Sequence, residues 1–157
     1  NLMLHKALDL ASPGDVIVVD AGGDLTNAML GEMMLAHAET RGLAGVVVHG
    51  AVRDLAAIKS GTFPVYATGV THRGPYKNGP GEINVPVSLD GMVVEPGDLI
   101  LGDDDGVVSV PFADAESICV EAEKKHTQET AHLQDILAGN VDRSWIDRTL
   151  KELGCKL

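Results

Sequence analysis

The sequence has few aromatic, cysteine and basic residues, and each shortage narrows what the protein can be. Aromatics make up only 3% of the 157 residues, so the core must consist mainly of Val, Leu, Ile, Ala and Met. There are 12 Lys and Arg against 23 Asp and Glu, which gives a formal net charge of −11. Nucleic-acid binding needs clustered basic side chains, and no basic run here exceeds Lys124-Lys125. We therefore expect no nucleic-acid partner.

Long apolar runs and cysteine motifs are also missing. Cys119 and Cys155 are far apart and form no CxxC motif, which disfavours a disulfide or a zinc site and favours the reducing cytoplasm. No apolar run approaches the roughly 20 residues that span a bilayer, so we expect a cytoplasmic protein without membrane segments. Residues 1–10 are typical of the middle or end of a helix, and the chain starts with Asn1 rather than Met. We expect further residues to precede Asn1 in the full protein.

The chain is long enough for one domain with a hydrophobic core. Short apolar runs bounded by Gly, Pro, Asn or Asp predict strands. The expected strands are residues 16–19, 46–48, 63–67, 83–87, 92–94, 98–101 and 107–110. The three aspartates at 103–105 lack the ligand spacing of a calcium loop, and we expect them to form a hairpin turn in which carboxylates accept hydrogen bonds from backbone N–H groups.

A helix is predicted from Asn27, as its N-cap, to Arg41. Gly31 lies within it, and glycine costs a helix interior roughly 1 kcal/mol relative to alanine. If the helix instead begins near Gly31, the free N–H groups of Glu32, Met33 and Met34 form an anion pocket. The other interpretation is a packing glycine where two helices cross. The sequence supports both equally.

A cation and a carboxylate, Arg53 and Asp54, stand together where the chain leaves the strand at residues 46–48. We expect this exit to be a turn that contains Gly50. Such a pair before a helix suits a site for a small anion and a metal. The alternative is that Asp54 only caps the helix at residues 55–60, and that Arg53 is an ordinary surface residue.

Two further segments have open interpretations. Residues 68–81 form a long polar loop with His72, Arg73 and Lys77, which is either a binding loop or merely flexible. Residues 112–138 show helical periodicity, with Glu129 on the apolar stripe. A carboxylate there must be paired or reach a polar site, unless the stripe simply frays. A last helix, capped by Asp142, carries the only Trp and suggests docking on another surface.

Several motifs occur in a fixed order: Gly14-Asp15-Val16-Ile17-Val18-Val19-Asp20, Gly31-Glu32, Gly50-Ala51-Val52-Arg53-Asp54, Pro96-Gly97-Asp98 and Asp103-Asp104-Asp105-Gly106-Val107-Val108. In this order and spacing they resemble the 4-hydroxy-4-methyl-2-oxoglutarate / 4-carboxy-4-hydroxy-2-oxoadipate aldolase family. The regulator of ribonuclease E activity A proteins share its fold. Residues 143–147 and 154–155 are more similar to the aldolases than to the regulators.

The resemblance implies an α/β fold of the layered β/β/α, swivelling-domain-like type, in which residues 1–157 form a single domain with C-terminal helices. It also implies a homotrimer or a dimer of trimers, with sites between subunits. Residues 112–153 are then expected to dock on a neighbouring subunit.

The resemblance also assigns roles. The family has an acidic residue, then twenty residues, then Arg-Asp, which Glu32, Arg53 and Asp54 match, with Glu in place of the usual Asp. Asp54 is expected to bind Mg²⁺ or Mn²⁺ directly, and Arg53 to hold the substrate beside its C2 carbonyl oxygen. After Gly31, the backbone N–H groups near Met33 and Met34 are expected to take the pyruvyl carboxylate. Glu32, and Glu129 from an adjacent subunit, are expected to hold metal-bound water.

The implied activity is that of a carbon–carbon lyase, which cleaves a 4-hydroxy-2-oxo diacid or triacid to pyruvate plus pyruvate or oxaloacetate. Decarboxylation of oxaloacetate gives the same pyruvate enolate, so we expect it as a side activity. For the 4-hydroxyl proton our hypothesis is a metal-bound water held by Glu32 or Glu129. One alternative is a non-catalytic, protein-binding regulator on the same fold, and the Arg53-Asp54 pair weighs against it. A second is an enolate-handling metalloenzyme of the same superfamily that acts on another substrate.

Overall fold

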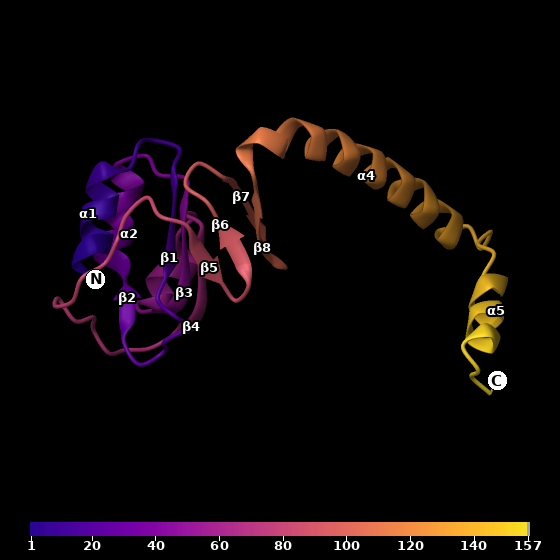
Figure 1. Cartoon of the computed structure of the whole chain (residues 1–157), viewed down its shortest axis with the longest axis horizontal. Coiled ribbons are helices and arrows are strands. Elements are labelled where there is room, and N and C mark those ends of the chain that lie inside the picture. The colour runs from indigo at the N-terminus through magenta and orange to yellow at the C-terminus, as the bar shows by residue number, and fades with distance from the viewer. Residues whose placement is uncertain (157) are drawn as a thin grey trace. The chain divides into compact units, whose positions relative to one another are not determined.

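The computed structural model describes residues 1–156 and divides into two compact units, Asn1–Phe112 and the chain from Ala113 onward (Figure 1). Within the described residues, all strands lie in the first unit, and the second unit holds two helices. The predicted α/β class with C-terminal helices is therefore confirmed.

The centre of the first unit is a parallel four-stranded sheet. Its strands are β1 (Val16–Asp20), β2 (Ala28–Leu30), β3 (Gly45–Val52) and β4 (Val65–Val70). The β4 strand pairs along one edge of β3, while β1 and β2 pair with successive parts of the other edge. β3 is buried along almost its whole length because it has neighbours on both edges.

Helices cover one face of this sheet, and two short hairpins lie on its other side (Figure 1). The helices are α1 (Leu2–Leu10), α2 (Glu32–Thr40) and α3 (Leu55–Ser60), and the hairpins are β5 (Val87–Leu89) with β6 (Met92–Val94), and β7 (Leu99–Asp103) with β8 (Gly106–Val110). Leu4 of α1 and Leu35 of α2 pack with Val46 and Val48 of β3. As predicted, the fully buried core is aliphatic.

The predicted helix from Asn27 to Arg41 is too long at its start. Residues 28–30 form β2, and α2 begins at Glu32 with Gly31 as its N-cap. Asn27 caps no helix because β2 follows it, and its side chain donates instead to the Gly74 carbonyl. The strand forms because Ala28 and Leu30 are drawn into the core beside β3, and this tertiary contact outweighs local helix propensity.

The predicted turn at Gly50 is also wrong, because β3 continues through it to Val52. Gly50 is a strand glycine for a packing reason. The loop after β1 crosses it, and a Cβ on Gly50 would lie 2.9 Å from the Ala21 Cβ. Glycine within a strand often marks such a close backbone approach.

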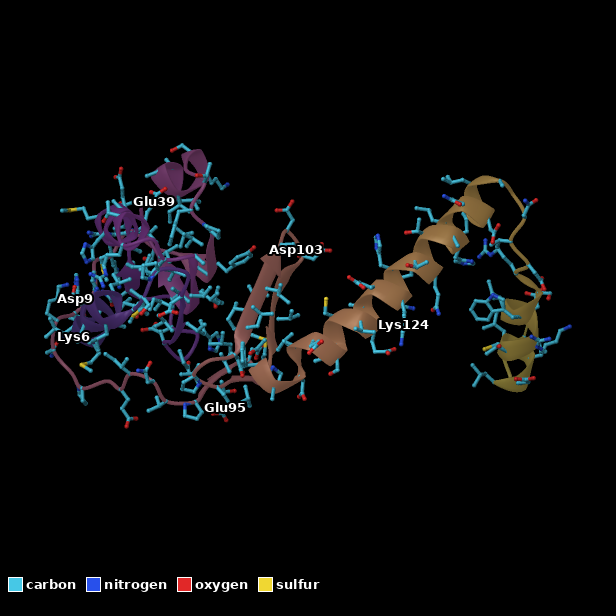
Figure 2. The ribbon with its side chains drawn as sticks, turned by 90° about the horizontal axis from the view of Figure 1, so that it is seen from above. Lys6, Asp9, Glu39, Glu95, Asp103 and Lys124 are labelled. Atoms are coloured by element: carbon cyan, nitrogen blue, oxygen red, sulfur yellow. The ribbon has the colours of Figure 1, made fainter. Side chains whose placement is uncertain are left out.

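The strand predicted at residues 83–87 is shorter and later, since β5 starts only at Val87. Asn84 has a left-handed φ of 56°, and Pro86 has no N–H to donate to a ladder. The predicted turn at residues 103–105 is confirmed. Asp103 lies at the end of β7 (Figure 2), and its carboxylate accepts a hydrogen bond from the Asp105 N–H at 2.9 Å.

The second unit consists of α4 (Ala115–Leu137), entered through a 3₁₀ turn at Phe112–Asp114, and α5 (Ser144–Glu152). Neither helix has a buried residue. The Asp142 carboxylate accepts hydrogen bonds from the Ser144 N–H and hydroxyl, which lower the pKa of Asp142. The N-cap of α5 is nevertheless Arg143, and no side-chain cap hydrogen bond forms there, so the prediction of Asp142 as the cap is wrong by one residue. No helix within residues 1–156 is both long and apolar enough to cross a membrane.

Candidate functional site

The site forms where two neighbouring strands end together. Because β2 and β3 are parallel, Gly31 after β2 and Arg53 after β3 leave the sheet at the same edge. The Arg53 N–H donates to the Leu30 carbonyl at 3.0 Å, which fixes the two exits side by side. Ligands in α/β sheets commonly bind at this carboxyl-terminal edge.

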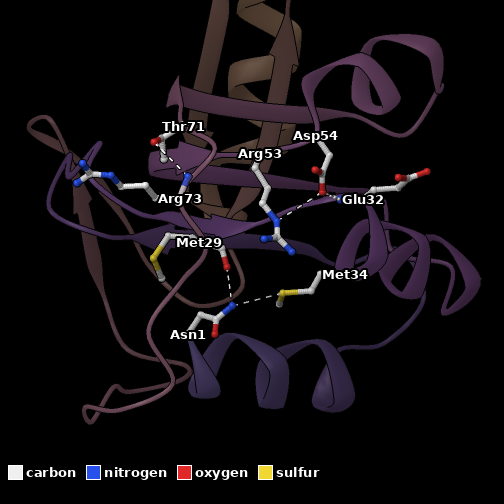
Figure 3. Close-up of polar contacts among 8 residues, drawn as sticks. All are labelled: Asn1, Met29, Glu32, Met34, Arg53, Asp54, Thr71 and Arg73. Carbon is white, nitrogen blue, oxygen red and sulfur yellow. Dashed lines mark hydrogen bonds and ion pairs between the residues drawn. The ribbon is translucent and has the colours of Figure 1, made fainter.

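The Asp54 carboxylate links the two strand ends. Its Oδ2 accepts a hydrogen bond from the Glu32 N–H at 3.0 Å and lies 3.6 Å from Arg53 Nε (Figure 3). The Glu32 N–H is one of the unpaired donors at the start of α2. Asp54 occupies the N-cap position of α3, as expected, but its side chain makes no cap hydrogen bond there. Its carboxylate accepts a hydrogen bond from the start of α2 instead.

The backbone of Asp54 is left-handed, with φ 61° and ψ 39°. Few non-glycine residues adopt this conformation, although Asp tolerates it better than most. It turns the Asp54 carboxylate back toward α2. Such outliers persist only where the surrounding structure holds them, and they cluster at functional sites.

Gly31 is the residue that lets Arg53 and Asp54 approach α2. A Cβ at this position would collide with Asp54 Oδ2 and would lie 2.7 Å from Arg53 Cγ. The φ of Gly31 is −154°, which any residue can adopt, so the requirement is space rather than backbone freedom. Of the two open interpretations, the helix start near Gly31 is therefore confirmed.

The N–H groups at the start of α2 are only partly available to an anion. The Glu32 N–H is bonded to Asp54, and the Met34 N–H donates to the Gly31 carbonyl at 3.1 Å. Within residues 1–156, the Met33 N–H has no hydrogen-bond acceptor. Met33 is 85% exposed, so this end of the helix is open to solvent. The carboxylate-binding role of Met33 and Met34 stays a prediction.

Glu32 joins the site through its backbone. Its carboxylate points away from the Arg53 guanidinium (Figure 3) and lines a hollow of about 200 Å³ together with Leu35, Ile58 and Phe63. Glu129 lies on α4 in the second unit, where its carboxylate is 3.3 Å from Lys125 Nζ and is 64% exposed. The predicted metal-associated roles of Glu32 and Glu129 stay predictions.

The acceptors at Asp54 suit a cation that retains most of its water. Within residues 1–156, no three His, Cys, Asp or Glu side chains gather into a metal-binding cluster. Asp54 Oδ2 is engaged by the Glu32 N–H, whereas no group in that range donates a hydrogen bond to Oδ1. One carboxylate oxygen plus waters is a normal protein contribution to Mg²⁺ coordination. Asp54 therefore fits the expected Mg²⁺ or Mn²⁺.

Two elements of the site were missed by sequence reasoning: the contact of Gly74 with Arg53, and the role of Asn27. A Cβ on Gly74 would lie 3.3 Å from Arg53 Nη1. The Arg73 side chain points away from Arg53 (Figure 3), and Lys77 is bound to Asn1 Oδ1 at 2.9 Å. In the sequence, the glycine-rich loop itself was the only signal for the contact between Gly74 and Arg53.

The site of this α/β fold places an arginine, a carboxylate and a helix start at the carboxyl ends of parallel strands, an arrangement of the kind that can hold a small anion beside a cation. The chain belongs to the RraA-like family, described as Aldolase/RraA, whose family model matches residues 1–109.

Related proteins have names of two different kinds. A Halalkalibacterium halodurans protein, provisionally named a 4-hydroxy-4-methyl-2-oxoglutarate aldolase, is 47% identical over 131 residues, 83% of this chain and 62% of the relative. A Thermus thermophilus 4-hydroxy-4-methyl-2-oxoglutarate aldolase is 39% identical over 71% of this chain and 68% of its own length. A solved structure from Thermus, named as the RNA-processing inhibitor RraA, superposes with a TM-score of 0.67 at 39% identity, over 71% of this chain and 68% of that one.

Substitution of Gly31 by alanine tests the close approach at the site. We expect Gly31→Ala to displace Asp54 and Arg53, because its Cβ would occupy the space of the Asp54 Oδ2 atom. Isothermal titration should then show that Mg²⁺ binds about tenfold more weakly, or weaker still. The control is Gly61→Ala at the end of α3, where an added Cβ meets only ordinary contacts of 3.6 Å. Equal Mg²⁺ affinity in both variants would contradict this account of Gly31.

Proposed function

We propose that the protein is a divalent-metal-dependent pyruvate aldolase. Its substrates would be 4-hydroxy-2-oxo diacids or triacids such as 4-hydroxy-4-methyl-2-oxoglutarate or 4-carboxy-4-hydroxy-2-oxoadipate, cleaved to pyruvate plus pyruvate or oxaloacetate. The observation that carries the proposal is the Arg53-Asp54 pair held against the start of α2 by the Glu32 N–H. The names of the two aldolase relatives support it.

Cleavage breaks the bond between C3 and C4 of the substrate. The 4-hydroxyl group loses its proton and becomes a carbonyl, and the bonding electrons pass to the pyruvyl part as an enolate, which is then protonated at C3. Negative charge therefore develops on the C2 oxygen. Fixed positive charge placed at that oxygen in advance lowers the barrier without reorganisation. We assign this task to the Arg53 guanidinium, which is 42% exposed and so accessible to a small anion.

The pyruvyl carboxylate would lie at the amino end of α2, where the Met33 N–H is available. The positive end of the helix dipole favours an anion there. Asp54 Oδ1 would hold Mg²⁺ or Mn²⁺, and a bound divalent cation would polarise the carboxylate and C2 carbonyl oxygens of the substrate. Decarboxylation of oxaloacetate requires the same charge stabilisation, and we propose it as a second activity.

Glu32 and Glu129 are our candidates for moving the 4-hydroxyl proton through water. The Glu32 carboxylate would need to turn from the hollow between α2 and α3 toward Asp54. Glu129 would act from an adjacent subunit, and we propose that the protein forms a homotrimer or a dimer of trimers. The proposed assembly is supported by exposed apolar side chains of the second unit, which are Ile118, Leu133, Ile136, Leu137, Trp145 and Leu153.

A second candidate function is that of a non-catalytic, protein-binding regulator. The Thermus structure, which is named as an RNA-processing inhibitor, favours it. The bonding of Asp54 weighs against it, because a regulator has no need of a carboxylate held in a left-handed backbone with one oxygen free.

The activity test is pyruvate release from oxaloacetate, with Mg²⁺ and with EDTA. We expect Mg²⁺-dependent release by the wild type and a loss of at least 100-fold in Asp54→Ala, because the variant lacks the metal ligand. Asp104→Ala, in the turn between β7 and β8, is the matched control and should keep full activity. Release no faster than the spontaneous rate, with Mg²⁺ present, would favour the regulator.

The proton-transfer roles predict a separation of turnover from metal affinity. A positioned acid or base typically contributes 10²–10⁴-fold, so Glu32→Gln and Glu129→Gln should lower kcat by at least tenfold while Mg²⁺ affinity changes little. Glu121→Gln removes a comparable ion pair on α4, with Lys124 at 2.6 Å, and should leave kcat unchanged. Full turnover in both test variants would rule the idea out.

The proposed assembly predicts a solution mass of three or six chains in light scattering. Leu137→Glu, which places a charge on a side chain that is 79% exposed in one chain, should shift the mass toward smaller species because a carboxylate cannot be buried unpaired at low cost. Glu152→Lys, at an exposed residue that is already charged, is the control. A monomeric wild type would contradict the assembly.

A further inference from the structure

The loop after β4 returns across the site instead of leaving it. The Thr71 N–H donates to the Val52 carbonyl at 3.0 Å, directly before Arg53. Two residues later, the Arg73 carbonyl accepts the Ala28 N–H at 2.9 Å. These two bonds carry the chain to Gly74, where a Cβ would lie 3.3 Å from Arg53 Nη1. The backbone of Gly74 thus stands beside the guanidinium.

Asn27 holds Gly74 in this place. Its Nδ2 donates to the Gly74 carbonyl at 2.6 Å, across 47 positions of sequence. Within residues 1–156, no other group is hydrogen-bonded to the Gly74 backbone. Asn27 is itself half-buried at the start of β2, next to the fully buried Ala28. The donor is therefore anchored on the sheet, whereas the loop that it holds is exposed.

The position of Gly74 matters for Arg53 because the ion pair with Asp54, which also restrains this side chain, is weak. Arg53 Nε lies 3.6 Å from Asp54 Oδ2, which is longer than a good hydrogen bond. A half-exposed ion pair of this kind restrains a long side chain little. Gly31 lies close to Cγ, where an added Cβ would be 2.7 Å away, and Gly74 lies close to the planar end of the side chain on its Nη1 side.

We propose that Asn27 is a positioning residue, which holds Gly74 against the Arg53 guanidinium and so sets the direction in which Arg53 presents its N–H groups to an anion. Its consequence for turnover rests on the proposed aldolase function. The restraint on Arg53 itself does not rest on that function, and it can be measured in a protein that has no activity. Misplacement of a binding group by about 1 Å can cost about 100-fold in rate.

The first measurement is the rate at which phenylglyoxal, an arginine-selective reagent, labels Arg53, located by mass spectrometry. In Asn27→Ala the labelling rate of Arg53 should rise at least threefold, while that of the exposed Arg148 stays constant. Hydrogen exchange at the Ala28 and Thr71 amides should also quicken. Asn27→Gln keeps the amide donor and should restore part of the protection. The control is Thr26→Ala, whose hydroxyl bonds only to Asp24 in the described part of the chain.

The second measurement is oxaloacetate decarboxylation by the same variants. We expect Asn27→Ala to lower kcat about tenfold with a smaller change in KM, because Arg53 acts on the charge that develops during reaction. Gly74→Ala pushes on Nη1 from the loop side and should have a similar effect. The double variant should be little worse than either alone, since both changes act through Arg53.

The outcomes separate the two proposals. Unchanged labelling of Arg53 in Asn27→Ala overturns the positioning role, and so does faster labelling with unchanged kcat in an active enzyme. If the wild type has no decarboxylase activity, the aldolase function fails, and faster labelling in Asn27→Ala still supports the restraint on Arg53.

Discussion

The hydrogen bond from the Glu32 N–H to Asp54 Oδ2 is the interaction on which the site depends. It joins the start of α2 to the end of β3, two segments that are 22 positions apart in sequence. Parallel pairing of β2 and β3 brings these segments to one edge, and the missing side chain of Gly31 lets them touch. A carboxylate bound to a helix start is also favoured by the helix dipole, so the same contact stabilises α2 and orients Asp54.

Asp54 divides its two oxygens between different tasks. Oδ2 accepts the hydrogen bond from the Glu32 N–H, whereas no group within residues 1–156 donates a hydrogen bond to Oδ1. Arg53 is confined from two sides, by Gly31 at its Cγ and by Gly74 at its Nη1. The arrangement holds a cation-binding oxygen and a guanidinium close together without neutralising either in a tight ion pair. Such preorganised charge is what stabilisation of a developing oxyanion requires.

Membership of the RraA-like family leaves a choice between catalysis and regulation, since relatives carry names of both kinds. The chain spans only 62% of the length of the Halalkalibacterium relative. The choice therefore depends on the chemistry of the site rather than on the fold, which hosts both functions.

The sequence by itself determined three of the four strands of the sheet, β1, β3 and β4 in part, together with the hairpin turn at residues 103–105, the helical C-terminal part and the Arg53-Asp54 pair. These depend on local periodicity, turn residues and adjacent positions, which a sequence displays directly. Only the tertiary structure decided that residues 28–30 form a strand, that Gly50 lies within β3, and that Asn27 reaches Gly74. Each follows from contacts between segments far apart in the chain, where burial beside β3 and the need to satisfy polar groups override local preference.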